Sequence, residues 1–198
     1  MRMATSVNIN GMKNRMIPAG YMAKRIMNRP NGYENSGIVD IYSVSGCMSE
    51  NFAYYDEFWK HNGYWFFDSP QIIQEIAKEH SIELTGTKLF YYEVYNLEFH
   101  EDNEWRSFEP EASFTTDIEK PNLKNLEGYD VVTFSCGNSA ECSPLSCNGL
   151  ANTIPVNKHC LLSSFDNAHQ LLESGEFRNS EAGPFRIFAV YSVSWLND

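Results

Sequence analysis

The sequence has no apolar run of the 18 or so residues that a membrane span needs. Its first residues, MRMATSVNINGMKNR, also lack the apolar centre of a signal peptide. Only five residues are cysteine, and an odd number in a chain without an export signal argues against a disulfide framework. These absences predict a cytoplasmic protein whose thiols are reduced.

Several motifs that carry chemistry are missing as well. There is no Walker loop, no GxGxxG, no HExxH and no GxSxG. Without a loop that cradles phosphate groups, an enzyme driven by a nucleotide is not expected. The chain contains no complete catalytic motif, which favours binding over catalysis.

What the chain does have is enough apolar material for a core. Hydrophobic residues make up 42% and aromatic residues 14% of 198 positions, so the length and composition predict one folded domain. Residues 1–15 are expected to form a flexible basic arm, and residues 16–198 a single domain with a cysteine-rich loop at 134–160.

The pattern of residues predicts the α+β class. Ser69 and Pro70 open the clearest helix, SPQIIQEIAKEHS, and Ser164 caps a second one that Gly175 ends. A short basic helix is expected at 20–28 and another helix at 50–60. Alternating, β-branched and aromatic segments predict strands. We therefore expect a mostly antiparallel or mixed sheet of five or more strands, covered by two or three helices. The predicted strands are 38–45, 64–67, 88–99, 105–108, 113–118, 128–135 and 184–195.

Charge is distributed unevenly along the chain. Residues 1–30 hold six basic and no acidic side chains, whereas the remainder holds nine basic and all 26 acidic ones. An acidic body repels the phosphates of nucleic acid, so nucleic acid binding is not expected except through the arm at 1–30. The predicted function is a non-catalytic interaction module that binds a basic protein partner.

Three cysteines fall within twelve positions of FSCGNSAECSPLSCNGL, residues 134–150, and Cys160 follows. Four soft ligands can hold zinc, although Cys142 and Cys147, with four residues between them, lie at the loose edge of the usual spacing and no matching second pair exists. The predicted ligands of a structural zinc site are Cys136, Cys142, Cys147 and Cys160. Ordinary packing is the alternative, since cysteine also behaves as a small hydrophobic residue.

A cysteine-dependent enzyme is the alternative function. In that interpretation Cys136 is the nucleophile, because it follows a buried strand and precedes Gly137, whose backbone can donate to an oxyanion. His159 or His61 is then the base that makes the thiolate. Apart from zinc, no cofactor is expected.

An acidic turn, HEDNE at 100–104, lies between two predicted strands. Carboxylates and an imidazole at such a turn can hold a divalent cation. The turn lacks the spacing of a dedicated calcium loop, so a solvated loop is the favoured interpretation.

Overall fold

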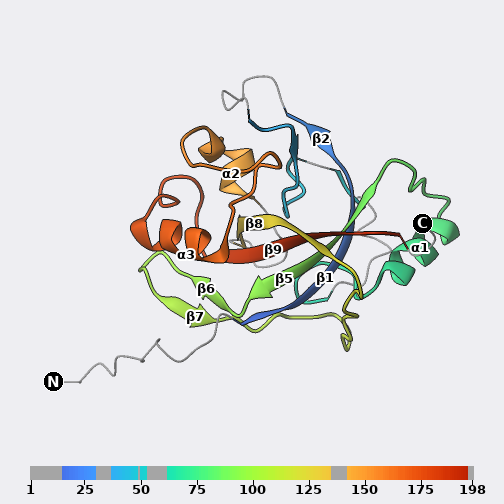
Figure 1. Ribbon diagram of the computed structural model, residues 1–198. Helices are drawn as coiled ribbons and strands as arrows, with labels where there is room; N and C mark the ends of the chain where they lie inside the picture. The colour runs from blue at the N-terminus through green and yellow to red at the C-terminus, as the bar shows by residue number, and fades with distance from the viewer. Residues whose placement is uncertain (1–14, 30–36, 49, 53–61, 135–141, 196–198) are drawn as a thin grey trace.

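A curved antiparallel sheet of seven strands dominates the computed structural model, which describes residues 15–29, 37–48, 50–52, 62–134 and 142–195. Helices lie at both ends of this sheet, as Figure 1 shows. The α+β class predicted from the sequence is confirmed. The strands of the sheet are β1 (Met16–Arg25), β4 (Glu50–Asn51), β5 (Lys88–Tyr95), β6 (Leu97–Phe99), β7 (Trp105–Ser107), β8 (Asn125–Thr133) and β9 (Phe185–Val193).

Strand order places sequence-distant segments side by side. The sheet runs β4-β1-β5-β9-β6-β7, and β8 pairs with β9 along nearly its whole length. The final strand, β9, is therefore central, with β5 and β6 on one side and β8 on the other. A separate ribbon joins β2 (Met27–Asn28) to β3 (Asp40–Ile41).

The helices form where caps and apolar spacing predicted them. In α1 (Pro70–Glu79) Ser69 Oγ accepts from the backbone of Ile72, and in α3 (Phe165–Ser174) Ser164 Oγ accepts from Asn167. Gly175 ends α3 with a φ of 85°, a left-handed conformation that costs glycine little. Two shorter helical segments are α2 (Pro144–Cys147) and the 3₁₀ turn at Leu150–Asn152.

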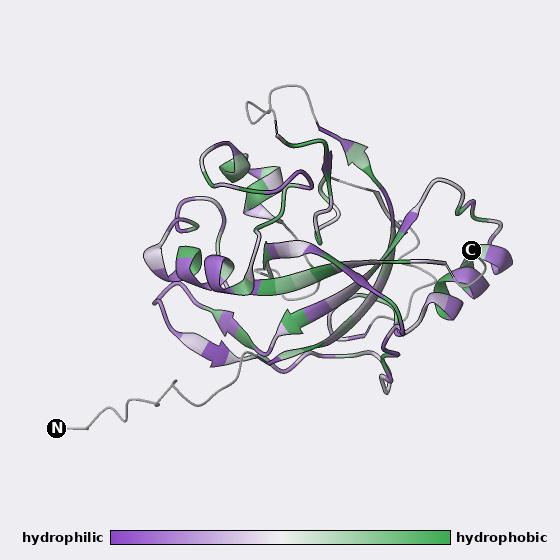
Figure 2. Cartoon of the chain, in the orientation of Figure 1, coloured by the Kyte–Doolittle hydropathy of each residue, from purple (hydrophilic) through white to green (hydrophobic). Residues whose placement is uncertain are grey.

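The apolar core fills the inside of the curved sheet. Figure 2 shows hydrophobic stretches on β5 and β9, and both hydrophobic and hydrophilic residues on α1 and α3. One cluster of buried side chains includes Met22, Phe90 and Phe188, and a second lies beneath α3 and includes Leu162 and Phe165. Two charged residues, Lys24 and Asp130, are wholly buried in the same interior.

Some local predictions were wrong. Residues 20–25 belong to strand β1, not to a basic helix, because residues 20–24 pair with β5 and Arg25 pairs with β4. Only Asp40–Ile41 of the 38–45 segment is a strand, and the chain then bends at residues 44–48. Residues 113–118 form no strand, and 64–67 contributes only a single bridge from Phe67 to Tyr21. The predicted helix at 50–60 lies mostly outside the described residues.

A bulge in β8 brings a loop against the sheet. At Gly128 φ is 151°, and a Cβ there would lie 2.7 Å from Cβ of Leu161 and 2.8 Å from the carbonyl oxygen of Leu162. Glycine is therefore required for this close approach. The loop so placed pairs with Tyr129 and stands beside the central part of β8, where Asp130 lies.

Candidate metal centre

Three cysteines from two distant parts of the chain meet at one end of the sheet. Cys47 comes from the loop that follows β3, whereas Cys142 and Cys147 come from the segment that enters and forms α2. Their three sulfur atoms all lie within 4.8 Å of one another. Cys47 is exposed and the other two are half-buried, so the cluster is open to solvent on one side.

The spacing of these sulfurs suits a thiophilic metal ion. Zinc–sulfur bonds of about 2.3 Å in a tetrahedron place neighbouring sulfurs roughly 3.8 Å apart. A separation of at most 4.8 Å therefore needs a closure of about 1 Å or less, which side-chain rotation provides. Thiolate ligands favour zinc or monovalent copper over magnesium or calcium.

One of the three sulfurs is already favoured as a thiolate. Hydrogen bonds from the Cys47 thiol, and secondarily from the thiol of Cys142 and the hydroxyl of Ser45, lower the pKa of Cys147 to about 5 against the opposing effect of burial. The pKa of Cys47 is raised, chiefly because its thiol donates to Cys147. Burial and the same kind of bond raise the pKa of Cys142. Cys147 is therefore the thiol of the cluster that ionises most readily.

A buried carboxylate lies behind the cluster. Asp130 Oδ1 accepts a hydrogen bond from Ser143 Oγ at 2.6 Å, and Oδ2 accepts from the backbone nitrogen of Val44 at 2.8 Å. Ser143 precedes α2, which ends at Cys147, and the backbone nitrogen of Cys147 donates to the Ser143 carbonyl. Both thiol-bearing segments thus contact the same side chain.

Lys24 completes this interior network. Its ammonium donates to the carbonyl oxygens of Ser43, Val44 and Ser45, the turn that leads to Cys47. Burial lowers the pKa of Lys24 and raises that of Asp130, and the attraction between the two charges opposes both shifts.

The sequence-predicted ligands divide into three groups. Cys142 and Cys147 belong to the cluster, and Cys136 lies outside the described residues. Cys160 is buried in the second core cluster, where burial raises the pKa of its thiol to about 12, and it is not among the three grouped sulfurs. Cys47 was missed because a lone cysteine far upstream gives no spacing signal.

His159, the base predicted for a cysteine enzyme, lies in another cluster. Its Nδ1 contacts the carboxylate of Asp40, and its Nε2 is 3.5 Å from Glu127. The ring also stacks on Tyr42 with centroids 3.9 Å apart. Both ring nitrogens thus face carboxylates. The other predicted base, His61, lies outside the described residues.

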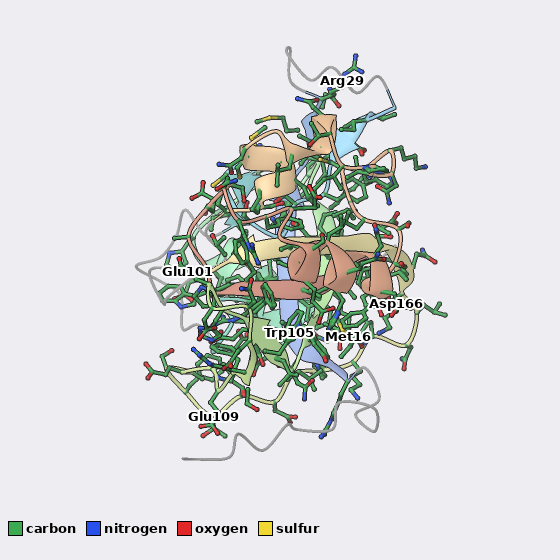
Figure 3. All side chains as sticks on the ribbon, turned by 90° about the vertical axis from the view of Figure 1, so that its left-hand side faces the viewer. Met16, Arg29, Glu101, Trp105, Glu109 and Asp166 are labelled. Atoms are coloured by element: carbon green, nitrogen blue, oxygen red, sulfur yellow. The ribbon has the colours of Figure 1, made fainter. Side chains whose placement is uncertain are left out.

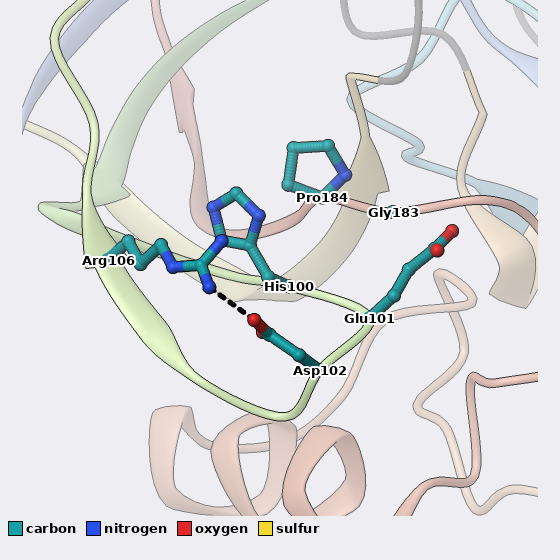
Figure 4. Close-up of a pocket in the computed structure, with 6 residues that line it drawn as sticks. All are labelled: His100, Glu101, Asp102, Arg106, Gly183 and Pro184. Carbon is teal, nitrogen blue, oxygen red and sulfur yellow. Dashed lines mark hydrogen bonds and ion pairs between the residues drawn. The ribbon is translucent and has the colours of Figure 1, made fainter. Parts of the chain in front are cut away.

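The acidic turn borders a separate cleft of about 430 Å³. Figure 4 shows His100 and Arg106 on one side of it and Pro184 on another, with Arg106 paired to Asp102. His100 Nε2 is 2.9 Å from Glu98, whose other oxygen binds Arg186. Among the residues that the structure describes, the turn forms no group of three metal-ligating side chains.

Comparisons of the chain with models of protein families, with curated proteins and with solved structures found no match. In the described part of the chain, no helix has the length and apolar character to cross a membrane. The function proposed below therefore rests on the geometry and chemistry of the molecule alone.

Proposed function

We propose that the protein is a zinc-binding interaction domain without catalytic activity. Zinc is bound by the sulfurs of Cys47, Cys142 and Cys147 and ties the loop after β3 to α2. The observation that carries this proposal is the grouping of three sulfurs within 4.8 Å from segments almost a hundred residues apart. Structural zinc contributes directly to folding free energy in small domains.

A binding role, not a catalytic one, is supported by the surroundings of the imidazole. A nucleophilic cysteine needs a base that is free to take its proton. His159 faces Asp40 on one ring nitrogen and Glu127 on the other. The fold therefore directs this side chain toward the carboxylates of Asp40 in β3 and Glu127 in β8.

The partner that fits best is a basic protein. The chain carries a net charge of −11, and exposed carboxylates gather around the β6–β7 hairpin and the segment after it. Figure 3 looks onto this end of the molecule, where Glu101, Trp105 and Glu109 are labelled. Binding of this kind weakens as salt screens the charges. Partners captured on the immobilised protein should elute with rising salt, and retention independent of salt would remove the electrostatic argument.

Zinc titration of the purified protein tests the metal proposal. We expect one zinc per chain in the wild type, and loss of at least 10-fold in affinity in each of Cys47→Ser, Cys142→Ser and Cys147→Ser. Cys160→Ser is the matched control, because that thiol lies in the core and outside the cluster. Cys136→Ser is a further arm that tests for a fourth sulfur ligand. Wild-type protein that binds no zinc, or that loses it equally in Cys160→Ser, contradicts the proposal.

The pH dependence of zinc binding follows from the thiol pKa values. Above pH 5 Cys147 is largely ionised, whereas the raised pKa values of Cys47 and Cys142 keep both protonated at neutral pH. Metal binding must displace those protons, about two per zinc. The apparent affinity should therefore rise about 100-fold per pH unit between pH 6 and 8. Calorimetry in buffers of different ionisation enthalpy counts the protons, and a pH-independent affinity contradicts thiol ligation.

A further inference from the structure

Asp130 bonds to both segments that carry the clustered thiols. It lies in the middle of β8 and is wholly buried. Oδ2 accepts from the backbone nitrogen of Val44 at 2.8 Å and from Ser43 Oγ at 3.3 Å. Oδ1 accepts from Ser143 Oγ at 2.6 Å and from the backbone nitrogen of Val131 at 2.9 Å. One oxygen thus bonds to Ser43 and Val44, which precede Cys47, and the other bonds to Ser143, which precedes α2.

Only a carboxylate satisfies this arrangement. Four donors converge on the two oxygens, and an ionised carboxylate offers about four acceptor positions, whereas an amide offers an acceptor on one side only. The opposite charge comes from Lys24, which gathers the carbonyl oxygens of the same turn. Residues 43–45 are therefore held on their amide side by Asp130 and on their carbonyl side by Lys24. Ser45 Oγ in turn lies 3.7 Å from the sulfur of Cys147.

We propose that Asp130 is the positioning residue of the thiol cluster, which sets the loop bearing Cys47 against the segment bearing Cys142 and Cys147. This inference deepens the proposed function and rests on it for the identity of the metal. The role of Asp130 in bringing the three sulfurs together does not depend on zinc. Groups that orient ligands in this way typically change metal affinity 10–100-fold when they are altered.

Binding of a trivalent arsenical tests whether two of the sulfurs lie close together in the absence of zinc. Phenylarsine oxide condenses with two thiols, so that two As–S bonds replace the As=O bond, and the two thiol protons leave with the oxygen as water. We expect the wild type to bind it tightly and Asp130→Asn to bind it at least 10-fold more weakly, since the amide cannot accept from both loops. Mass spectrometry after arsenical treatment and alkylation should find two more of the three clustered thiols alkylated in Asp130→Asn than in the wild type, because each bound arsenical protects two thiols.

Glu98→Gln is the matched control. Glu98 is another buried carboxylate of the same sheet, but its bonds go to Arg186 and His100. Its variant should bind the arsenical and zinc as the wild type does. Ser143→Ala removes only one of the bonds to Asp130 and should give a smaller loss. If circular dichroism shows that Asp130→Asn is unfolded, Ser143→Ala is used in its place to test the proposal.

The outcomes separate the two proposals. Equal arsenical binding by wild type, Asp130→Asn and Ser143→Ala overturns the role of Asp130, whatever the zinc titration finds. Loss of arsenical binding in Asp130→Asn, while Glu98→Gln binds as the wild type does, supports that role even if the wild type takes up no zinc, in which case only the zinc function fails. A wild type that binds neither probe shows that the thiols do not meet, and overturns both.

Discussion

Two sets of oppositely charged side chains, Asp130 with Lys24 and Glu98 with Arg186, are buried in the interior of one sheet, and their hydrogen bonds go to different kinds of partner. Asp130 and Lys24 bond to the backbone and hydroxyl groups of two loops. Glu98 and Arg186 bond mainly to each other, at 3.0 and 2.8 Å. The first pair positions loops that carry thiols, whereas the second joins β6 to β9.

Aromatic rings make the second pair more tolerant of change. The guanidinium carbon of Arg186 lies 3.2 Å from the centroid of Phe108 and 3.9 Å from that of Phe134. Its Nη1 has no hydrogen-bond partner among the described residues. Glu98 keeps a second contact through His100. The aromatic rings therefore stabilise part of the buried charge of Arg186, whereas hydrogen bonds to carbonyl oxygens stabilise that of Lys24. The two sites should respond differently to mutation.

The largest effect is expected at Lys24. Lys24→Met leaves three carbonyl groups and the Asp130 carboxylate without their cation, and should lower the free energy of unfolding by about 3–5 kcal/mol. Arg186→Met keeps an apolar side chain between the two phenylalanine rings and leaves Glu98 bonded to His100. Its loss should be about 1.5–3 kcal/mol.

Urea unfolding of both variants measures this difference. The double variant Lys24→Met/Asp130→Asn should recover part of the loss, because it removes the uncompensated charge. Equal losses at Lys24 and Arg186, with strictly additive effects in the double variant, would contradict the distinction between the two pairs.

A smaller effect on stability is expected when a single buried hydroxyl group is removed. The hydroxyl of Tyr92 is buried without a partner among the residues described, and burial, with the nearby Asp130, raises its pKa. Tyr92→Phe should leave stability unchanged or raise it by up to about 1 kcal/mol, since no bond is lost. Tyr21 provides the control, because its hydroxyl donates to the carbonyl of Glu119 at 2.9 Å.

Tyr21→Phe should therefore lower the free energy of unfolding by about 1 kcal/mol. Thermal or urea unfolding of the two variants side by side resolves a difference of this size. A larger loss for Tyr92→Phe than for Tyr21→Phe would show that the interior contains a polar partner for Tyr92.

Local signals predicted α1, α3 and the strands β5, β8 and β9, but not β1, the longest strand. Ser69 and Ser164 indicate the starts of α1 and α3 in the sequence because capping is a local interaction. The aromatic and β-branched content of 88–99 likewise predicts β5 and β6. These features depend on neighbours in the sequence, so the sequence alone reveals them.

The candidate site was only partly predictable, because its decisive contacts are long-range. Residues 20–28 were predicted as a basic helix, since nothing local indicates that Lys24 would be buried among the carbonyls of another segment. Cys142 and Cys147 were predicted from their crowding, but Cys47 joins them through a loop that Asp130 and Lys24 hold. Cys160 is near in sequence and lies in the core instead.

The most direct test of the zinc proposal is the X-ray absorption spectrum of the zinc-loaded protein at the zinc edge. We predict at least three sulfur neighbours at about 2.3 Å. The Cys142→Ser variant should lose one of them, and Cys160→Ser should lose none. A spectrum that contains only nitrogen or oxygen neighbours, near 2.0–2.1 Å, would contradict the proposed thiol site.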